Sequence, residues 1–111
     1  MSGRAGAVVV ELSPELTGKQ RRYLRSLAHA LRPLVMVGHE GASDGVVASV
    51  DAALADHELI KVKVLNNYSG NLGELARHIA KGTSSSLVQQ VGRVLVFFRP
   101  DPEESQIVLP S

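Results

Sequence analysis

The chain has 111 residues, of which 44% are hydrophobic and 21% are charged, and its formal net charge is +1. This length suits one domain with one core, and this apolar content argues against a chain that is disordered throughout. There is no cysteine, which excludes disulfides and thiolate chemistry and favours a cytoplasmic setting. No apolar run is long enough for a membrane span, and residues 5–10 are too short for the apolar part of a signal peptide. We therefore expect a cytoplasmic globular domain without a membrane partner.

Charge is distributed in blocks along the chain. Residues 1–32 carry six basic and two acidic side chains, whereas residues 33–58 carry five acidic side chains and no basic one. Residues 59–99 are again basic, and residues 100–111 are acidic. This alternation predicts one basic and one acidic face if the two basic blocks fold side by side. A mixed surface on which the charges average out is an equally good interpretation.

The first predicted element is a helix over residues 16–31. Residues 1–12 are expected to form a loose extension or a short edge strand, and the folded domain is expected to cover residues 13–111. Ser13-Pro14-Glu15 is typical of a helix start, and Pro33 forces the chain out of the helix. Four cations on this helix have no acid among them: Lys19, Arg21, Arg22 and Arg25. They either follow a phosphate backbone or form an ordinary solvated helix face.

Next come a strand, a glycine loop and a second helix. Residues 34–37 are an apolar run of strand length, and residues 44–55 have helical periodicity with Ser43 or Asp44 as the cap. Between them lies the loop Gly38-His39-Glu40-Gly41. Free backbone N–H groups and the positive end of a helix dipole at such a junction suit a phosphate, and glycines let a sugar–phosphate chain approach closely. The simpler interpretation is that both glycines only form a tight turn.

A second strand is predicted over residues 59–65. Apolar side chains alternate there with Lys61 and Lys63, which places both lysines on one face of the strand. A helix packed across the lysines would bury two ammonium groups at high cost, so we expect this face to be at least partly open. The two lysines are candidate phosphate contacts, or they are simply the wet face of an edge strand.

The remaining sequence predicts a third helix and further strands. The helix is expected between the cap residue Asn71 and Gly82, which would follow its last turn. Residues 87–91 and 94–98 are predicted strands, and residues 107–109 are expected to return as a short edge strand. The strand, loop, helix and strand that begin at residue 34 predict a βαβ unit with two parallel strands.

Several phrases of this sequence occur together and resemble one family, the CRM domain (chloroplast RNA splicing and ribosome maturation). The chain is similar in length to stand-alone bacterial members, and the resemblance covers residues 16–99. Its phrases are Leu16-Thr17-Gly18-Lys19-Gln20, Leu24-Arg25, Ala28-His29-Ala30-Leu31, Pro33, Gly38-His39-Glu40-Gly41, His57-Glu58-Leu59-Ile60-Lys61-Val62-Lys63-Val64, Val88-Gln89-Gln90-Val91-Gly92-Arg93 and Val96 to Arg99, with weaker support from the tail Ile107-Val108-Leu109-Pro110.

The resemblance implies an α/β fold formed by a single compact domain. A mixed four-stranded sheet and three helices are expected, similar to the C-terminal domain of translation initiation factor three. It also implies RNA binding without catalysis and, in bacteria, association with precursors of the large ribosomal subunit. By the same resemblance, the loop from Gly38 to Gly41 and nearby basic residues would contact the RNA.

The loop departs from the family pattern in two ways. Glu40 is acidic where a basic or neutral polar pair is common, and Ala42-Ser43 stands where Leu-Thr commonly follows. Glu40 and Asp44 would repel a phosphate unless Glu40 points away or pairs with an arginine. The departures leave the fold assignment intact and put the strength of the loop contact in question.

Catalytic and metal sites have little support in the sequence. The four histidines lack the two-ligands-on-one-turn spacing, and there is no cysteine, so neither a metal nor another cofactor is expected. Ser43, His39 and Asp44 lie too close in sequence for the geometry of a catalytic triad. No Lys-Ser or Lys-Thr follows Gly41 as it would in a Walker loop. We therefore do not expect an enzyme.

The predicted partner is RNA, and the resemblance implies ribosomal RNA of large-subunit precursors. The chain is expected to act as a monomer. The predicted RNA contacts are Gly38, His39, Glu40, Gly41, Lys19, Arg21, Arg22, Arg25, Lys61 and Lys63. Two alternatives stay open: a KH-like module that reads single-stranded RNA, and a protein-interaction module whose acidic residues 40–58 dock a basic ribosomal protein.

Overall fold

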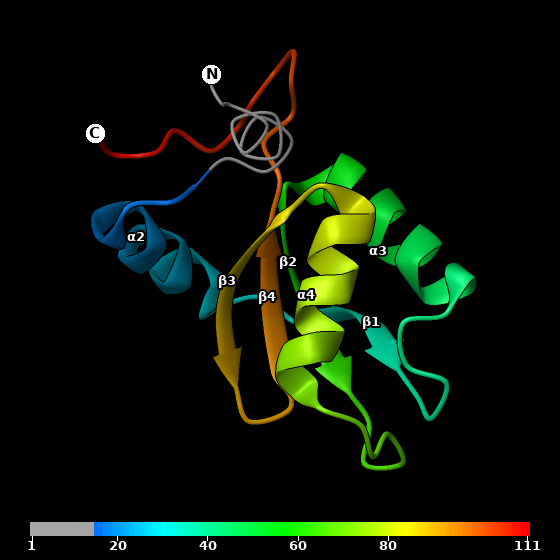
Figure 1. The fold of residues 1–111 in the computed structure, drawn as a ribbon. Coiled ribbons are helices and arrows are strands. Elements are labelled where there is room, and N and C mark those ends of the chain that lie inside the picture. The colour runs from blue at the N-terminus through cyan, green and yellow to red at the C-terminus, as the bar shows by residue number, and fades with distance from the viewer. Residues whose placement is uncertain (1–14) are drawn as a thin grey trace, which may run out of the picture.

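The computed structural model describes residues 15–111 and contains one mixed sheet with helices on both faces (Figure 1). Its elements are α2 (Gly18–Ala28), β1 (Pro33–Val37), α3 (Asp44–His57), β2 (Leu59–Val64), α4 (Leu72–Thr83), β3 (Ser86–Val91) and β4 (Val94–Phe98). The strand order is β1-β2-β4-β3, with β1 parallel to β2 and the other neighbours antiparallel. The predicted α/β class with four strands and three helices is confirmed over the described residues. The predicted extension, residues 1–12, lies outside them.

One face of the sheet is covered by α3 and α4. The alternation along β2 points Ile60, Val62 and Val64 to this side, where none is more than 1% exposed. Leu95 and Phe97 reach the same core from β4, and Val50, Leu54, Leu75, Ala76 and Ile79 reach it from the two helices. Burial of this apolar set is the main source of stability in the domain.

The opposite face is covered over part of its width by α2. Leu24 and Ala28 of this helix form a second buried cluster with side chains of the sheet: Leu59, Val88, Val96 and Phe98. Ile107 and Leu109 of the C-terminal tail pack against the same cluster. On this face Lys61 is half-buried and Lys63 is exposed, as the alternation of β2 predicts.

The helix α2 is shorter than predicted at both ends. It begins after Thr17, whose hydroxyl accepts a hydrogen bond from the backbone N–H of Gln20 at 3.1 Å. The Gln20 side chain accepts one from the N–H of Thr17 in return, also at 3.1 Å. This capping box satisfies two amides that a longer helix would have to pair elsewhere, so it fixes the start. The helix ends at Ala28, before the predicted residue 31.

The ends of α3 and α4 confirm the predicted caps and correct one prediction. Ser43 caps α3 and Asn71 caps α4. Gly82, however, lies inside α4, and Ser84 has the left-handed conformation that follows the helix. A Cβ at Gly82 would lie 3.2 Å from Cγ1 of Val47 on α3. The glycine therefore allows the two helices to approach each other rather than ending one of them.

The tail does not form the predicted edge strand. The backbone N–H groups of Gln106 and Ile107 donate to the carboxylate of Glu58 at 2.9 and 3.0 Å. The N–H of Asp101 donates to the other carboxylate oxygen at 2.5 Å. Because these amides are paired with a side chain, they are not available for a strand ladder. Glu58, only 4% exposed, holds the tail in place.

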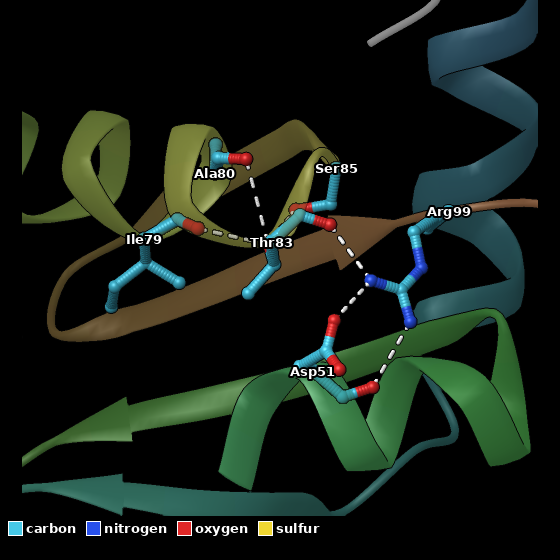
Figure 2. Close-up of polar contacts among 6 residues, drawn as sticks. All are labelled: Asp51, Ile79, Ala80, Thr83, Ser85 and Arg99. Carbon is cyan, nitrogen blue, oxygen red and sulfur yellow. Dashed lines mark hydrogen bonds and ion pairs between the residues drawn. The ribbon is translucent and has the colours of Figure 1, made fainter. Parts of the chain in front are cut away.

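Figure 2 shows that Arg99, which directly follows β4, contacts α3 and α4 through its guanidinium group. Its guanidinium donates to the Asp51 carboxylate at 2.6 Å and to the backbone carbonyl of Thr83 at 2.7 Å. A second nitrogen donates to the carbonyl of Asp51 at 3.0 Å. The Thr83 hydroxyl in turn donates to the carbonyl of Ile79 and lies 2.8 Å from the Ser85 hydroxyl. Arg99 therefore holds α3, α4 and β4 together instead of offering its charge to a ligand.

Candidate nucleic-acid interface

The part of the sheet that α2 leaves open is the candidate interface. It is formed by the side chains of β1 and β2 that point away from α3 and α4. Leu34 and Met36 of β1 are each 51% exposed there. Met36 is in register with Lys63, and paired residues of neighbouring strands point to the same face. The open surface is thus a strip of apolar and cationic side chains.

The predicted cations of α2 have different environments. Lys19, Arg22 and Arg25 are exposed, whereas Arg21 is half-buried. The Arg21 guanidinium donates to the backbone carbonyls of Leu87 and Val88 at 2.5 and 3.0 Å. The pairing of β3 with β4 shifts register at this place, and Arg21 satisfies the displaced carbonyls. Its charge is therefore used to anchor the helix to β3.

Arg93, which directly precedes β4, also uses its charge to stabilise the fold. Its guanidinium donates to the backbone carbonyls of Val64, Leu65 and Tyr68 at 3.2, 2.9 and 2.5 Å. The Val64 carbonyl is at the end of β2, and the other two belong to the turn between β2 and α4. The basic block over residues 59–99 thus keeps Lys61 and Lys63 for the open face while Arg93 and Arg99 stabilise the fold.

The two glycines of the loop after β1 have different environments. Gly41 has φ +67° and is buried, and a Cβ there would lie 2.8 Å from Cε1 of Tyr68. Its N–H donates to the carbonyl of Gly38 at 3.0 Å and closes the turn. A Cβ at Gly38 would only come within 3.8 Å of the Asn67 side chain. The fold therefore requires a glycine at position 41 and does not require one at position 38.

The loop presents main-chain donors but acidic side chains. His39 and Glu40 are exposed, and within residues 15–111 no hydrogen bond from their backbone N–H groups is recorded. The first-turn amides of α3 add further donors at its N-terminus. A hollow of about 310 Å³ beside the loop is lined by Glu40 and Glu74 together with Tyr68 and His78. Its charge disfavours a phosphate, while the free N–H groups favour one.

The structure does not place the cationic helix beside the glycine loop. α2 packs across β2, β3 and β4, while the loop follows β1 at the other side of the sheet (Figure 1). Lys61 and Lys63 of β2 lie between them. Lys63 is the predicted cation nearest to the loop by register, because its partner Met36 precedes Gly38 by two residues. Arg21 is anchored to β3, and Arg25 and Lys61 line one groove, so the structure does not gather the predicted contacts into one cluster.

The structure also reveals a groove that sequence analysis missed. It lies between the C-terminal half of α2 and the sheet, has a volume of about 710 Å³, and includes Arg25 and Lys61 in its walls. Its other polar walls come from Ser26, His29 and Gln89, and its floor from Val91 and Val94. The alternation of residues 87–91 indicates that Gln89 and Val91 share a face, but only the sheet order brings them to α2.

Two further observations concern the described residues alone. Within residues 15–111, no group of three or more histidine, cysteine, aspartate or glutamate side chains is arranged to hold a metal ion. Among the helices of the same residues, none has both the length and the apolar content that crossing a bilayer requires.

Comparison with known proteins gives concordant matches. The family model described as the CRS1 / YhbY (CRM) domain matches residues 16–99. The chain is 43% identical over 95 residues to the Bacillus subtilis protein named "Probable RNA-binding protein YqeI", covering 86% of this chain and 99% of that protein. It is 42% identical over 95 residues to a Haemophilus influenzae protein named "RNA-binding protein", covering 86% and 95% of the two chains.

A solved structure has the same fold. The solution structure of the Staphylococcus aureus protein SAV1595 matches with a TM-score of 0.75 and 43% sequence identity, over 86% of this chain and 100% of that one. The segment that the family model matches, residues 16–99, contains all seven helices and strands. It also contains the glycine loop and the open face of β2. The chain therefore belongs to the CRS1 / YhbY (CRM) domain family.

Proposed function

We propose that this protein binds RNA without catalysing a reaction on it, and that it acts as a cytoplasmic monomer in assembly of the large ribosomal subunit. The observation that carries the proposal is the open half of the sheet, where Lys63 is exposed and Lys61 is half-buried beside α2. Relatives named as RNA-binding proteins match nearly their whole length to this chain, which supports RNA as the ligand. The ribosomal role rests on the family resemblance.

The mechanism is electrostatic capture followed by main-chain contact. Phosphates lie along the track formed by Arg22 and Arg25 on α2 and the lysines of β2, which releases counterions. The backbone N–H groups of His39 and Glu40, within the loop from Gly38 to Gly41, then contact the sugar–phosphate chain. Lys19 extends the track at the start of α2, and Arg21 contributes by anchoring the helix. His39 adds a donor to this contact, and the Glu40 carboxylate must turn away from the RNA.

The decisive variant is Lys61→Glu with Lys63→Glu, measured by fluorescence anisotropy on a labelled RNA over a range of salt concentrations. We expect affinity to fall at least tenfold, and the slope of log K against log salt to fall by about two, one for each lysine. The matched control is Arg77→Glu with Lys81→Glu. It makes the same change of charge on exposed residues of α4, behind the covered face. Equal losses in the two double variants would contradict the proposed track.

The cationic helix is tested by Arg22→Glu with Arg25→Glu. Because phosphate contacts carry no sequence information, the double variant should weaken binding to all RNA sequences alike. Crosslinking in cells and sequencing of the bound RNA tests the biological part of the proposal. Enrichment of large-subunit precursor RNA is expected, and an RNA pool without ribosomal precursors would overturn the assembly role.

A further inference from the structure

The groove between α2 and the sheet has the composition of a site for a small, flat, partly polar group. Its floor on the sheet is aliphatic and includes Val91 of β3 with Val94 and Val96 of β4, while Ala28 lines it from α2. At one end Val91 is 57% exposed, which is unusual for a valine on a strand beside a core cluster. A volume of about 710 Å³ is in the range of ligand pockets and larger than one nucleobase needs.

The polar walls of the groove differ in whether they already have a partner, because the Ser26 hydroxyl donates to the backbone carbonyl of Tyr23 at 2.6 Å. Within residues 15–111 the side-chain amide of Gln89 makes no hydrogen bond. Within residues 15–111 the ion pair is between Arg99 and Asp51. Neither Arg25 nor Lys61 therefore has an acidic partner among these residues. An amide offers both donors and an acceptor, which is what the edge of a nucleobase requires.

The position of the groove distinguishes a base from a phosphate as its occupant. The residues that α2 contributes, from Arg25 to His29, are in its last turn and at its C-cap. The C-terminal end of a helix carries partial negative charge, which repels an anion and attracts donor groups. The cations Arg25 and Lys61 suit the phosphates that flank the base.

We propose that this groove holds one unpaired nucleoside of the bound RNA, with the base against the valine floor and its phosphates on Arg25 and Lys61. The inference rests on the proposed function, because it deepens RNA binding from a charged track to a site selective for unpaired nucleotides. A base in a duplex is stacked and cannot enter the groove, whereas a base in a loop or bulge can be turned out into it. Single-stranded RNA should therefore bind more tightly than the same sequence in a duplex.

The test uses the full chain and two forms of one RNA, a labelled 12-nucleotide single strand and its blunt duplex. Gln89→Ala with Val91→Ser changes the groove without changing charge. The matched control is Gln106→Ala with Val108→Ser, the same pair of substitutions on the tail, where Val108 is 79% exposed. We expect the groove variant to lose about five- to tenfold in affinity for the single strand and nothing for the duplex. The control variant should change neither affinity.

Each of the other outcomes would overturn a specific part of the proposal. Equal binding of both RNA forms by the unmodified protein, or an equal loss for both forms in the groove variant, would overturn the nucleoside site while leaving the charged track intact. A dimer in sedimentation that the groove variant dissociates would assign the groove to a second copy of the chain. Failure of the unmodified protein to bind either RNA would instead overturn the proposed function itself.

A second measurement does not depend on substitutions. RNA carrying 4-thiouridine at single positions, crosslinked to the unmodified protein by near-ultraviolet light, should attach within β3 or the last turn of α2. Crosslinks confined to residues 38–41 would mean that bases contact the glycine loop and not the groove. Thermal unfolding of both double variants verifies that their folds are intact.

Discussion

The two faces of the sheet are built from the same strands and differ in what covers them. Val62 is fully buried beneath α3 and α4, and its neighbours Lys61 and Lys63 point to the other face. On that face α2 and the tail cover only a part, because β1 and one end of β2 have no helix above them. Alternation along one strand thus divides stability and binding between the two sides of a single layer.

The difference between the two faces explains how so small a domain can expose a binding surface and still be stable. With α3 and α4 both on one side, the core there has buried residues from β1, β2 and β4, and Leu87 of β3 packs against it. Charged or polar substitutions on the open face should therefore change ligand affinity with little change in folding. Substitutions on the covered face should act in the opposite way.

The largest expected effect is on the covered face, from Phe97→Ala. Phe97 is fully buried between the sheet and its two helices, and its removal leaves a cavity. The free energy of unfolding should fall by about 3–5 kcal/mol, as measured by urea denaturation. Val91→Ala, at the exposed end of β3 beside the groove, is the comparison, and it should change this free energy by about 0.5 kcal/mol or less. Similar losses in both variants would mean that Val91 is packed against something in solution.

A smaller effect is expected from Glu58→Gln, which loosens the tail on the partly covered face. Burial alone raises the pKa of Glu58, but hydrogen bonds from the backbone N–H groups of Asp101, Ile107 and Gln106 outweigh it and lower that pKa below the ordinary value of 4.5. The variant cannot accept all three bonds, so we expect a loss of about 2 kcal/mol at neutral pH. Hydrogen exchange should show the loosening in the tail and α2, but not in α4.

The pH dependence of this loss follows from the direction of the pKa. A carboxyl with a lowered pKa in the folded state stabilises the fold fully above its unfolded pKa. The stabilisation is lost as the pH falls below about 4.5 and through the folded value. The difference in unfolding free energy between the unmodified protein and Glu58→Gln should therefore shrink on acidification. A difference that stays constant down to pH 3 would show that the Glu58 carboxylate is not the group responsible.

Local patterns in the sequence predict much of this architecture, and the exceptions are long-range. The alternation of β2 predicts both the core and the open face, and Ser43 and Asn71 are caps that a few residues define. Arg21 is different, because its anchoring carbonyls belong to a strand 66 and 67 residues away. Gly82 is also different, since its role depends on the approach of Val47 from another helix.

The candidate site also has parts that local sequence predicts and parts that depend on long-range contacts. The open lysines and the glycine loop can be found from the sequence alone, since each is a local pattern. The groove cannot, because it requires the order β2-β4-β3 and the position of α2 above it. The tail is the third such case: its apolar residues indicate a strand, but the buried carboxylate of Glu58 takes the amides that a strand would use.

The smallest expected effects come from the glycine pair, and they separate folding from binding within one loop. Gly41→Ala places a Cβ at φ +67° and against the ring of Tyr68, so it should lower the unfolding free energy by about 1–2 kcal/mol. Gly38→Ala makes only ordinary van der Waals contact with the Asn67 side chain and should leave stability unchanged. If RNA approaches the main chain at this loop, Gly38→Ala should still weaken RNA binding, because the new methyl group then meets the ligand. Unchanged affinity in a fully folded Gly38→Ala variant would restrict RNA contact to the sheet face and leave the loop with a purely structural role.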